Sequence, residues 1–259
     1  MNTTRSIALA ISFLTLSGLA QPGVAHAAPA ARCEAVSSVG DAVNDQQALK
    51  ADARLGLSRD THENDRVALN EMLLGAHATP LRWDRVPELV VLMPVMQYEK
   101  GRSTEYRATG EQLTDEDAAQ LVADLTDALG VLTNDAFRGF AAVRREFVAA
   151  GTTVNVMRPG QIVVARYNGV RDQLATIGFG GRSTRGSTIR AGSIILDNDF
   201  DSMNGTRRLL RMHELGHALG YNHVVSRISI MNPKIGPEPT DFDRAVARLA
   251  FEDFKDSCS

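Results

Sequence analysis

The pattern of hydrophobic and polar positions changes near residue 87. Residues 34–86 are polar and mixed, with apolar positions at helical spacing in DRVALNEMLLGAH, residues 65–77. From residue 87, the continuous apolar and β-branched run PELVVLMPVMQY predicts a buried strand. Shorter strand candidates follow, separated by glycine-containing turns. These candidates are TTVNVM (152–157), QIVVARY (161–167), LATIGFG (174–180) and AGSIILDN (191–198).

Helical spacing of apolar residues predicts four helices in the second part of the chain. They cover residues 113–130, 135–151, 204–220 and 240–254. Thr114 with Asp117, and Thr240 with Asp243, have the spacing of residues that cap helix starts. A strand, a helical crossover and then several strands predict an α+β fold in which a mixed sheet carries a packed helix.

The first 27 residues have the pattern of a secretory signal peptide. Arg5 precedes an apolar run from Ile7 to Leu19, and Ala25-His26-Ala27 supplies a small-x-small cleavage site. The run is too short to span a membrane comfortably, and no long apolar stretch follows residue 28. We therefore expect a signal peptide at 1–27, an N-terminal region at 28–86 that is a helical appendage or a pro-segment, and a main domain at 87–259. The mature protein should be secreted, extracellular or periplasmic, without a membrane anchor.

Charge and cysteine content add further expectations. The formal net charge of -3 gives no electrostatic basis for binding nucleic acid. Cys33 and Cys258 are the only cysteines, and such a pair in an oxidising compartment predicts a disulfide between the two ends of the mature chain. The alternative is that the Cys33 thiolate caps a metal ion. We expect a monomer.

Candidate chemistry lies in MHELGHALGYNHVVSRISIMNP, residues 212–233. His213 and His217 are four residues apart, so both project from one face of a helix and can share one cation. Glu214 beside them can take the proton of a metal-activated water. His223 can reach the same cation only if the helix ends before it, and Gly220 can adopt the left-handed conformation that ends helices. The sequence therefore predicts one catalytic zinc ion held by three histidines.

These residues resemble the metzincin zinc peptidases, whose pattern is H-E-x-x-H-x-x-G-x-x-H followed by a Met-turn. Met231 in SIMNP stands at the position of the Met-turn methionine, and its short spacing from His223, with Pro233 after it, resembles the matrixin branch. The resemblance implies a twisted mixed five-stranded sheet packed with a crossover helix and an active-site helix, and a C-terminal helix after the Met-turn. Its specific part covers about residues 191–250.

Departures from the matrixin pattern change two expectations. Asn232 stands where matrixins have a tyrosine, and Pro233 takes the position of the tyrosine ligand of other branches, so we expect no tyrosine ligand. Matrixins carry a second zinc ion held by histidines. Outside the motif, the mature chain has only His62 and His77, so we expect no such second site.

The acidic stretch DNDFD invites a calcium interpretation through Asp197, Asp199 and Asp201. An EF-hand loop has glycine at its sixth position and glutamate at its twelfth, where this chain has Ser202 and Arg208. We expect turn and helix-capping roles for the three aspartates. A looser calcium site is left open, without support from the sequence.

The combined expectation is a secreted zinc endopeptidase that acts on a polypeptide substrate. The three histidines bind zinc, and Glu214 is the general base for the attacking water. Residues 175–181, including Ile177, Gly178 and Phe179, are the candidate sheet edge that pairs with the substrate backbone. Two alternatives stay open: a zinc-containing module that binds without catalysis, against which Glu214 argues, and a zinc amidase that acts on cell-wall peptide.

Overall fold

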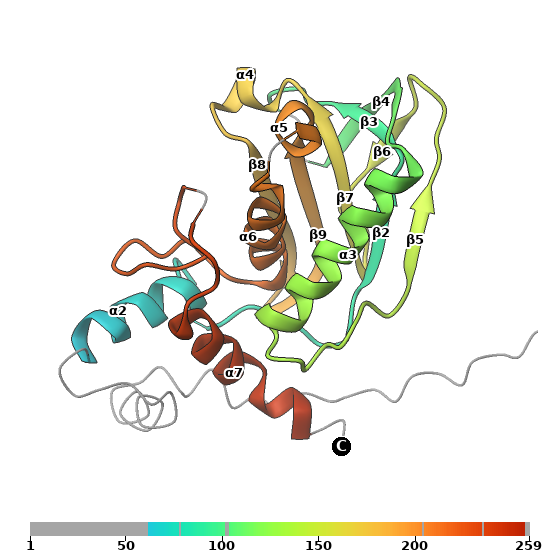
Figure 1. The fold of residues 1–259 in the computed structure, drawn as a ribbon. Helices are drawn as coiled ribbons and strands as arrows, with labels where there is room; N and C mark the ends of the chain where they lie inside the picture. Colours follow the sequence, from blue (N-terminus) through green and yellow to red (C-terminus); the bar gives the residue numbers. More distant parts are fainter. Residues whose placement is uncertain (1–61, 78, 102–103, 204, 235, 257–259) are drawn as a thin grey trace, which may run out of the picture. The chain divides into compact units, whose positions relative to one another are not determined.

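The structure is a computed structural model that describes residues 62–256, apart from 78, 102–103, 204 and 235 (Figure 1). The predicted signal peptide at 1–27, residues 28–61, and both Cys33 and Cys258 lie outside the described residues. The predicted disulfide is therefore not tested. None of the described helices is long and apolar enough to cross a membrane.

The described residues form an α+β fold with a mixed sheet. Its helices are α2 (His62–Leu73), α3 (Asp115–Leu132), α4 (Val170–Leu174), α5 (Asn198–Met203), α6 (Arg207–Leu219) and α7 (Asp241–Asp256). Its strands are β1 (Arg82–Trp83), β2 (Glu88–Leu92), β3 (Pro94–Gln97), β4 (Glu105–Gln112), β5 (Val143–Glu146), β6 (Thr153–Asn155), β7 (Gln161–Asn168), β8 (Gly178–Arg185) and β9 (Thr188–Asp197).

Parallel strands form the centre of the sheet. β7 and β9 pair in parallel, with Ile162 opposite Gly192 and Tyr167 opposite Asp197. β2 pairs in parallel with β7 on the other side, and β5 pairs in parallel with β2. β8 runs antiparallel to β9 and pairs with no other described strand, so it is an edge strand. The predicted mixed sheet is confirmed, but it contains nine described strands instead of five.

Most of the predicted elements are present. The apolar run at 87–98 forms β2 and β3, and the shorter candidates form β6, β7, β8 and β9. The helices predicted at 113–130, 204–220 and 240–254 are α3, α6 and α7. The Asp117 amide donates to Thr114 Oγ1 at 3.0 Å, and the Asp243 amide donates to Thr240 Oγ1 at 3.3 Å. Both predicted helix caps are therefore confirmed.

The helix predicted at 135–151 is wrong. Val143 to Glu146 instead form β5, in which Val143 lies opposite Leu89 of β2. Asn134 and Asp135 adopt φ angles of 48° and 59°, which separate this segment from the end of α3. Pairing with the buried, apolar β2 satisfies the backbone of the segment, so a long-range contact overrides its helical spacing.

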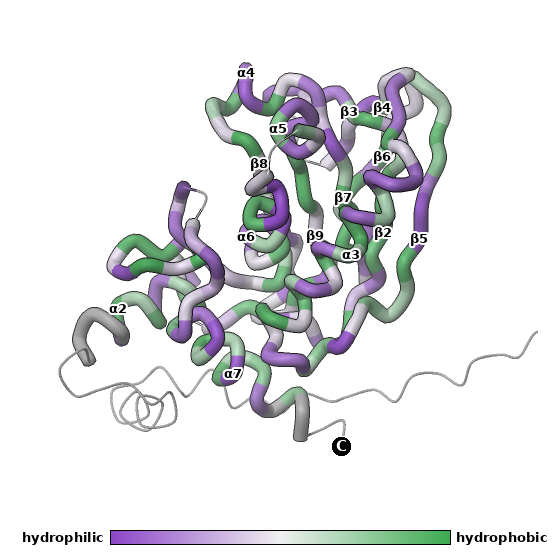
Figure 2. Tube along the Cα trace, viewed as in Figure 1, coloured by the Kyte–Doolittle hydropathy of each residue, from purple (hydrophilic) through white to green (hydrophobic). Residues whose placement is uncertain are grey.

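Both faces of the sheet are buried, because strand side chains alternate between them. On one face, Leu89, Ile162 and Ile194 pack in a core with side chains of α2, α3, α6 and α7. On the other face, Val90 and Val163 pack in a second core with side chains of β4 and β6. Figure 1 shows α3 and α6 side by side over the sheet, and Figure 2 shows the hydrophobic strands behind them. The predicted N-terminal region thus contributes α2 to the main core.

Candidate metal centre

Helix α6 presents the first part of the site. Its buried stripe of Met212, Leu215 and Leu219 fixes its rotation, as the apolar spacing predicted. The helix ends at Gly220, whose φ of 118° is left-handed, and this confirms the predicted stop. A Cβ atom at Gly220 would collide with the Leu81 carbonyl oxygen, so glycine is required by the close approach as well as by φ.

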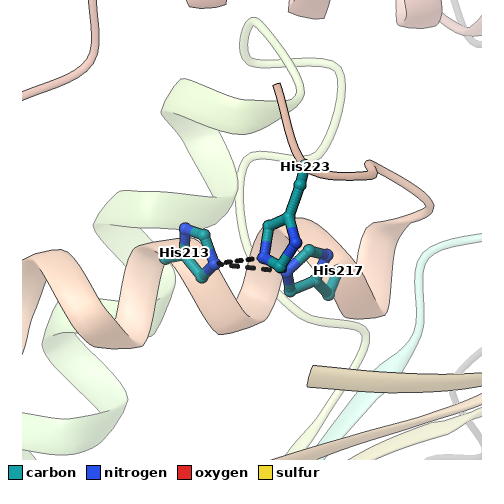
Figure 3. Close-up of side chains that lie close together, drawn as sticks. All are labelled: His213, His217 and His223. Carbon is teal, nitrogen blue, oxygen red and sulfur yellow. Dashed lines mark hydrogen bonds between the residues drawn. The ribbon is translucent and has the colours of Figure 1, made fainter. Parts of the chain in front are cut away.

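The three predicted histidines converge at the end of this helix. Figure 3 shows His213 and His217 projecting from α6 and His223 reaching toward them from the segment after the helix. The three Nε2 atoms form a triangle with sides of 3.0, 3.2 and 3.3 Å. Among the described residues, this is the only group of three or more histidine, cysteine or acidic side chains placed to hold a metal ion.

Hydrogen bonds and burial keep the imidazole rings neutral and leave their Nε2 atoms free to bind a cation. His213 Nδ1 lies 2.7 Å from the Ile230 carbonyl oxygen, and His217 Nδ1 lies 2.9 Å from that of Tyr221. A carbonyl oxygen can only accept, so both Nδ1 atoms carry the proton and both Nε2 atoms keep a lone pair. Burial, with the neighbouring His213, lowers the pKa of His217 to about 3. Burial also lowers the pKa of His213 and of His223, so all three rings are neutral at neutral pH.

The triangle fits a tetrahedral zinc ion. Two nitrogen ligands at zinc–nitrogen distances of about 2.0–2.1 Å lie about 3.4 Å apart in tetrahedral coordination, close to the observed separations. Without a cation, the lone pairs of His213 and His217 face each other at 3.2 Å with no proton between them. The donor set therefore suits a cation that imidazole prefers, such as zinc.

No protein-family model and no curated protein matches this chain.

Glu214 directly follows His213 in the sequence and is only 4% exposed. Burial raises the pKa of its carboxyl to about 8, while a hydrogen bond from the Gly180 amide opposes the rise. A cation held by the neighbouring histidines would favour the ionised carboxylate.

The edge strand β8 lies directly against α6. A Cβ atom at Gly180 would lie 2.6 Å from His217 Cβ, so glycine lets the strand approach the helix this closely. A cleft of about 510 Å³ follows this strand and is lined by Glu214 and the three histidines. Gly178 and Phe179 belong to β8, whereas Ile177 precedes it and accepts a backbone hydrogen bond from Asp197 at 2.9 Å. All three predicted edge residues line the cleft.

Met231, the predicted Met-turn residue, packs against α6. Its Sδ atom is 2.5 Å from the position of a Cβ atom at Gly216, between the two helix histidines, and the side chain is fully buried. Asp243 of α7 fixes the turn, because its carboxylate accepts from the Ile230 amide at 3.1 Å and from the Ser229 hydroxyl. Since the Ile230 carbonyl orients His213, α7 helps to set that ring.

Arg182 of β8 is a contributor that sequence reasoning did not identify. Its guanidinium donates to the carbonyl oxygens of His217 at 2.9 Å and Tyr221 at 3.2 Å, and to Asn222 Oδ1 at 2.6 Å. Burial lowers the pKa of Arg182. A single arginine thus ties the edge strand to the end of α6 and to the residue before His223. In the sequence, the only local feature that could have indicated this role is the position of Arg182 beside the glycines of the predicted edge strand.

Two of the three aspartates considered for calcium, Asp197 and Asp201, have other roles. Asp197 accepts from the Phe200 amide at 3.0 Å, which caps α5 as predicted, and pairs with Arg171. Asp201 is fully buried and pairs with Arg166 and Arg211. The prediction of turn and capping roles is thus confirmed for Asp197 and wrong for Asp201, because an ion-pair network between α5, α6 and β7 uses its carboxylate.

Proposed function

We propose that this protein is a secreted zinc-dependent endopeptidase of the metzincin type, with His213, His217 and His223 as metal ligands. The observation that carries the proposal is the triangle of Nε2 atoms, 3.0–3.3 Å apart, in a cleft that is also lined by the largely buried Glu214. Three histidines leave a fourth position open on a tetrahedral ion, which is the arrangement of catalytic rather than structural zinc sites.

Each part of the cleft has a separate task in this proposal. The outer edge of β8 takes the backbone of an extended polypeptide as an additional strand. The carbonyl oxygens of Ile230 and Tyr221 hold the imidazole rings with their Nε2 atoms directed inward. When bound, zinc lowers the pKa of a water molecule and polarises a peptide carbonyl group.

Glu214 moves the proton in this reaction. Its carboxylate accepts a proton from the attacking water and delivers it to the nitrogen of the leaving amine. The Gly180 amide hydrogen bonds to the Glu214 side chain and fixes its direction from β8. Because Glu214 is buried and is not needed as a fourth protein ligand, proton transfer gives its presence a chemical reason.

Digestion assays test the proposal against the two alternatives. The purified protein should cleave denatured protein substrates, lose this activity when a chelator removes the metal, and regain it when zinc is added. Cell-wall peptide is assayed in parallel. Cleavage that survives complete metal removal would contradict the proposal. Activity on cell-wall amide bonds alone would favour the amidase, and zinc binding without any hydrolysis would favour the binding module.

A further inference from the structure

A second hollow adjoins the metal cleft on the side of α2. It measures about 560 Å³ and lies between α2 and the segment that carries His223. His223 lines both the metal cleft and this hollow, so the two adjoin at this side chain. Figure 1 shows the segment after α6 passing close to α2, and Figure 2 shows hydrophobic stretches in it.

The segment that forms one wall of the hollow donates hydrogen bonds to acceptors on α2, which fix its position. Glu71 Oε2 accepts from the amides of Val225 and Ser226 at 2.9 and 3.1 Å, and from the Ser226 hydroxyl at 2.8 Å. The Asn222 amide donates to the Met72 carbonyl oxygen at 2.8 Å. The Asn222 side-chain amide donates to the same oxygen at 3.3 Å, so five hydrogen bonds join α2 to both flanks of His223.

The hollow lies in line with the edge strand. Along β8, Gly178 lies against Leu210 and Glu214, and Gly180 lies against His217. Arg182, two residues further along the strand, binds Asn222 at the end of α6. An extended chain that pairs with β8 therefore runs past the histidines toward α2 and the hollow.

The lining of the hollow is chemically suited to an apolar group. Val67 of α2 is 46% exposed and Val225 is 70% exposed, and Leu74 lies between α2 and the following turn. Polar side chains also line the hollow, namely Asn70, Glu71, His77, Asn222 and His223. Hydrogen bonds to Val225 and Ser226 engage the Glu71 carboxylate, and hydrogen bonds with Arg182 and Met72 engage the Asn222 side chain. Val67 and Val225 thus offer exposed apolar side chains from α2 and from the segment after His223 to a group that enters the hollow.

We infer that this hollow is a substrate subsite that binds an apolar side chain of the polypeptide, on the α2 side of the scissile bond. The inference rests on the proposed function. It makes α2 a specificity element of the cleft, although α2 lies about 150 positions earlier in the chain than the metal ligands.

The test compares Val67→Asp with Val143→Asp. Val143 on β5 is also 46% exposed and lines none of the hollows described above, so it is a matched control. Val67→Asp should raise KM about 10-fold for peptides with an apolar residue on the α2 side, at unchanged kcat and zinc content. Product sequencing from a peptide library should show that the apolar preference is lost on that side only. Val67→Thr, which keeps the side-chain shape, should shift KM in the same direction by less and guards against misfolding.

The outcomes separate the two proposals. An unchanged KM and library profile in Val67→Asp, or an equal change in Val143→Asp, would contradict the proposed subsite. Neither result would contradict the proposed peptidase activity. If the unmodified protein shows no zinc-dependent cleavage, both the proposed function and the proposed subsite are wrong.

Discussion

The helix-borne and loop-borne histidines of the metal site are held in different ways. His213 and His217 belong to one helix, and His213 is buried. His223 is exposed and follows the helix, and the residues around it are tied to α2 through Glu71 and Asn222. Local geometry therefore fixes the two helix ligands, whereas contacts across about 150 residues help to fix the third.

This difference indicates where the site is robust and where it is sensitive. Helix α6 is anchored by its apolar stripe and by the buried Arg211, so its two ligands share the stability of the core. The segment that carries His223 is held by hydrogen bonds to α2, and by the buried Val224, whose amide donates to the Met231 carbonyl oxygen at 2.9 Å. We expect changes near α6 to affect folding and changes in α2 to affect metal affinity.

The largest effect should come from removing a helix ligand. His217→Ala should abolish measurable zinc binding, because losing a ligand costs more than the about 10–100-fold caused by losing an outer partner. His77→Ala, which removes an exposed histidine outside the ligand set, should keep the metal. Zinc content per chain after dialysis measures both. Equal zinc content in the two variants would remove His217 from the site.

The next effect concerns the anchoring of α6. Arg211 is fully buried and donates to Asp201 at 2.7 and 2.8 Å and to Asp124 at 2.7 Å. Arg211→Ala leaves two buried carboxylates without this partner and should lower the free energy of unfolding by about 3–5 kcal/mol. Arg208 lies on the same helix and forms an exposed ion pair with Glu238, which precedes α7. Arg208→Ala breaks this pair and should lower the free energy of unfolding by at most about 1 kcal/mol. Denaturant unfolding compares them, and equal losses would contradict the anchoring role.

Loosening the loop-borne ligand should have a smaller and more selective effect. Glu71→Ala removes three hydrogen bonds from the segment after His223. Zinc affinity should fall by about 10–100-fold, because Glu71 acts as an outer partner of the ligand. Competition with a coloured chelator measures the affinity, and Glu116→Gln on the exposed face of α3 is the control. If Glu71→Ala bound zinc as tightly as the unmodified protein, α2 would have no part in holding His223.

The smallest effect is the pH dependence of the same contact. Burial raises the pKa of Glu71, but hydrogen bonds from Ser226 and Val225 outweigh it and hold the pKa below its ordinary value of 4.5. A pKa that is lowered in the folded state contributes stability above the unfolded value, and this contribution disappears as the pH falls through the folded value. The stability difference between the unmodified protein and Glu71→Gln should therefore be full near about pH 6 and shrink below about pH 4.5. A difference that grows on acidification would contradict this contact.

The helix-borne half of the site could be predicted from the sequence because its determinants are local. Spacing of four residues aligns His213 with His217, and Gly220 ends the helix as expected. The caps of α3 and α7 were equally visible, since each depends on residues three apart. A structural feature that depends only on neighbouring residues can be predicted directly from the sequence.

The contacts that hold His223 could not be predicted, because they join distant segments. Glu71 appears in the sequence only as a polar residue of a short helix, and Arg182 as one of several basic residues near a turn. The helix prediction around Val143 was wrong for the same reason, since pairing with β2 overrides the helical spacing of the segment. The second core on the far face of the sheet likewise depends on long-range pairing.

The most direct test of the proposed mechanism separates metal binding from proton transfer at Glu214. Glu214→Gln keeps the size of the side chain and leaves all three histidines in place. Zinc content and protein hydrolysis should be measured on the same preparation of this variant and of the unmodified protein. We predict equal zinc content and a rate of hydrolysis lower by about 10²–10⁴-fold, since the general base is lost. Hydrolysis at the unmodified rate would contradict the mechanism.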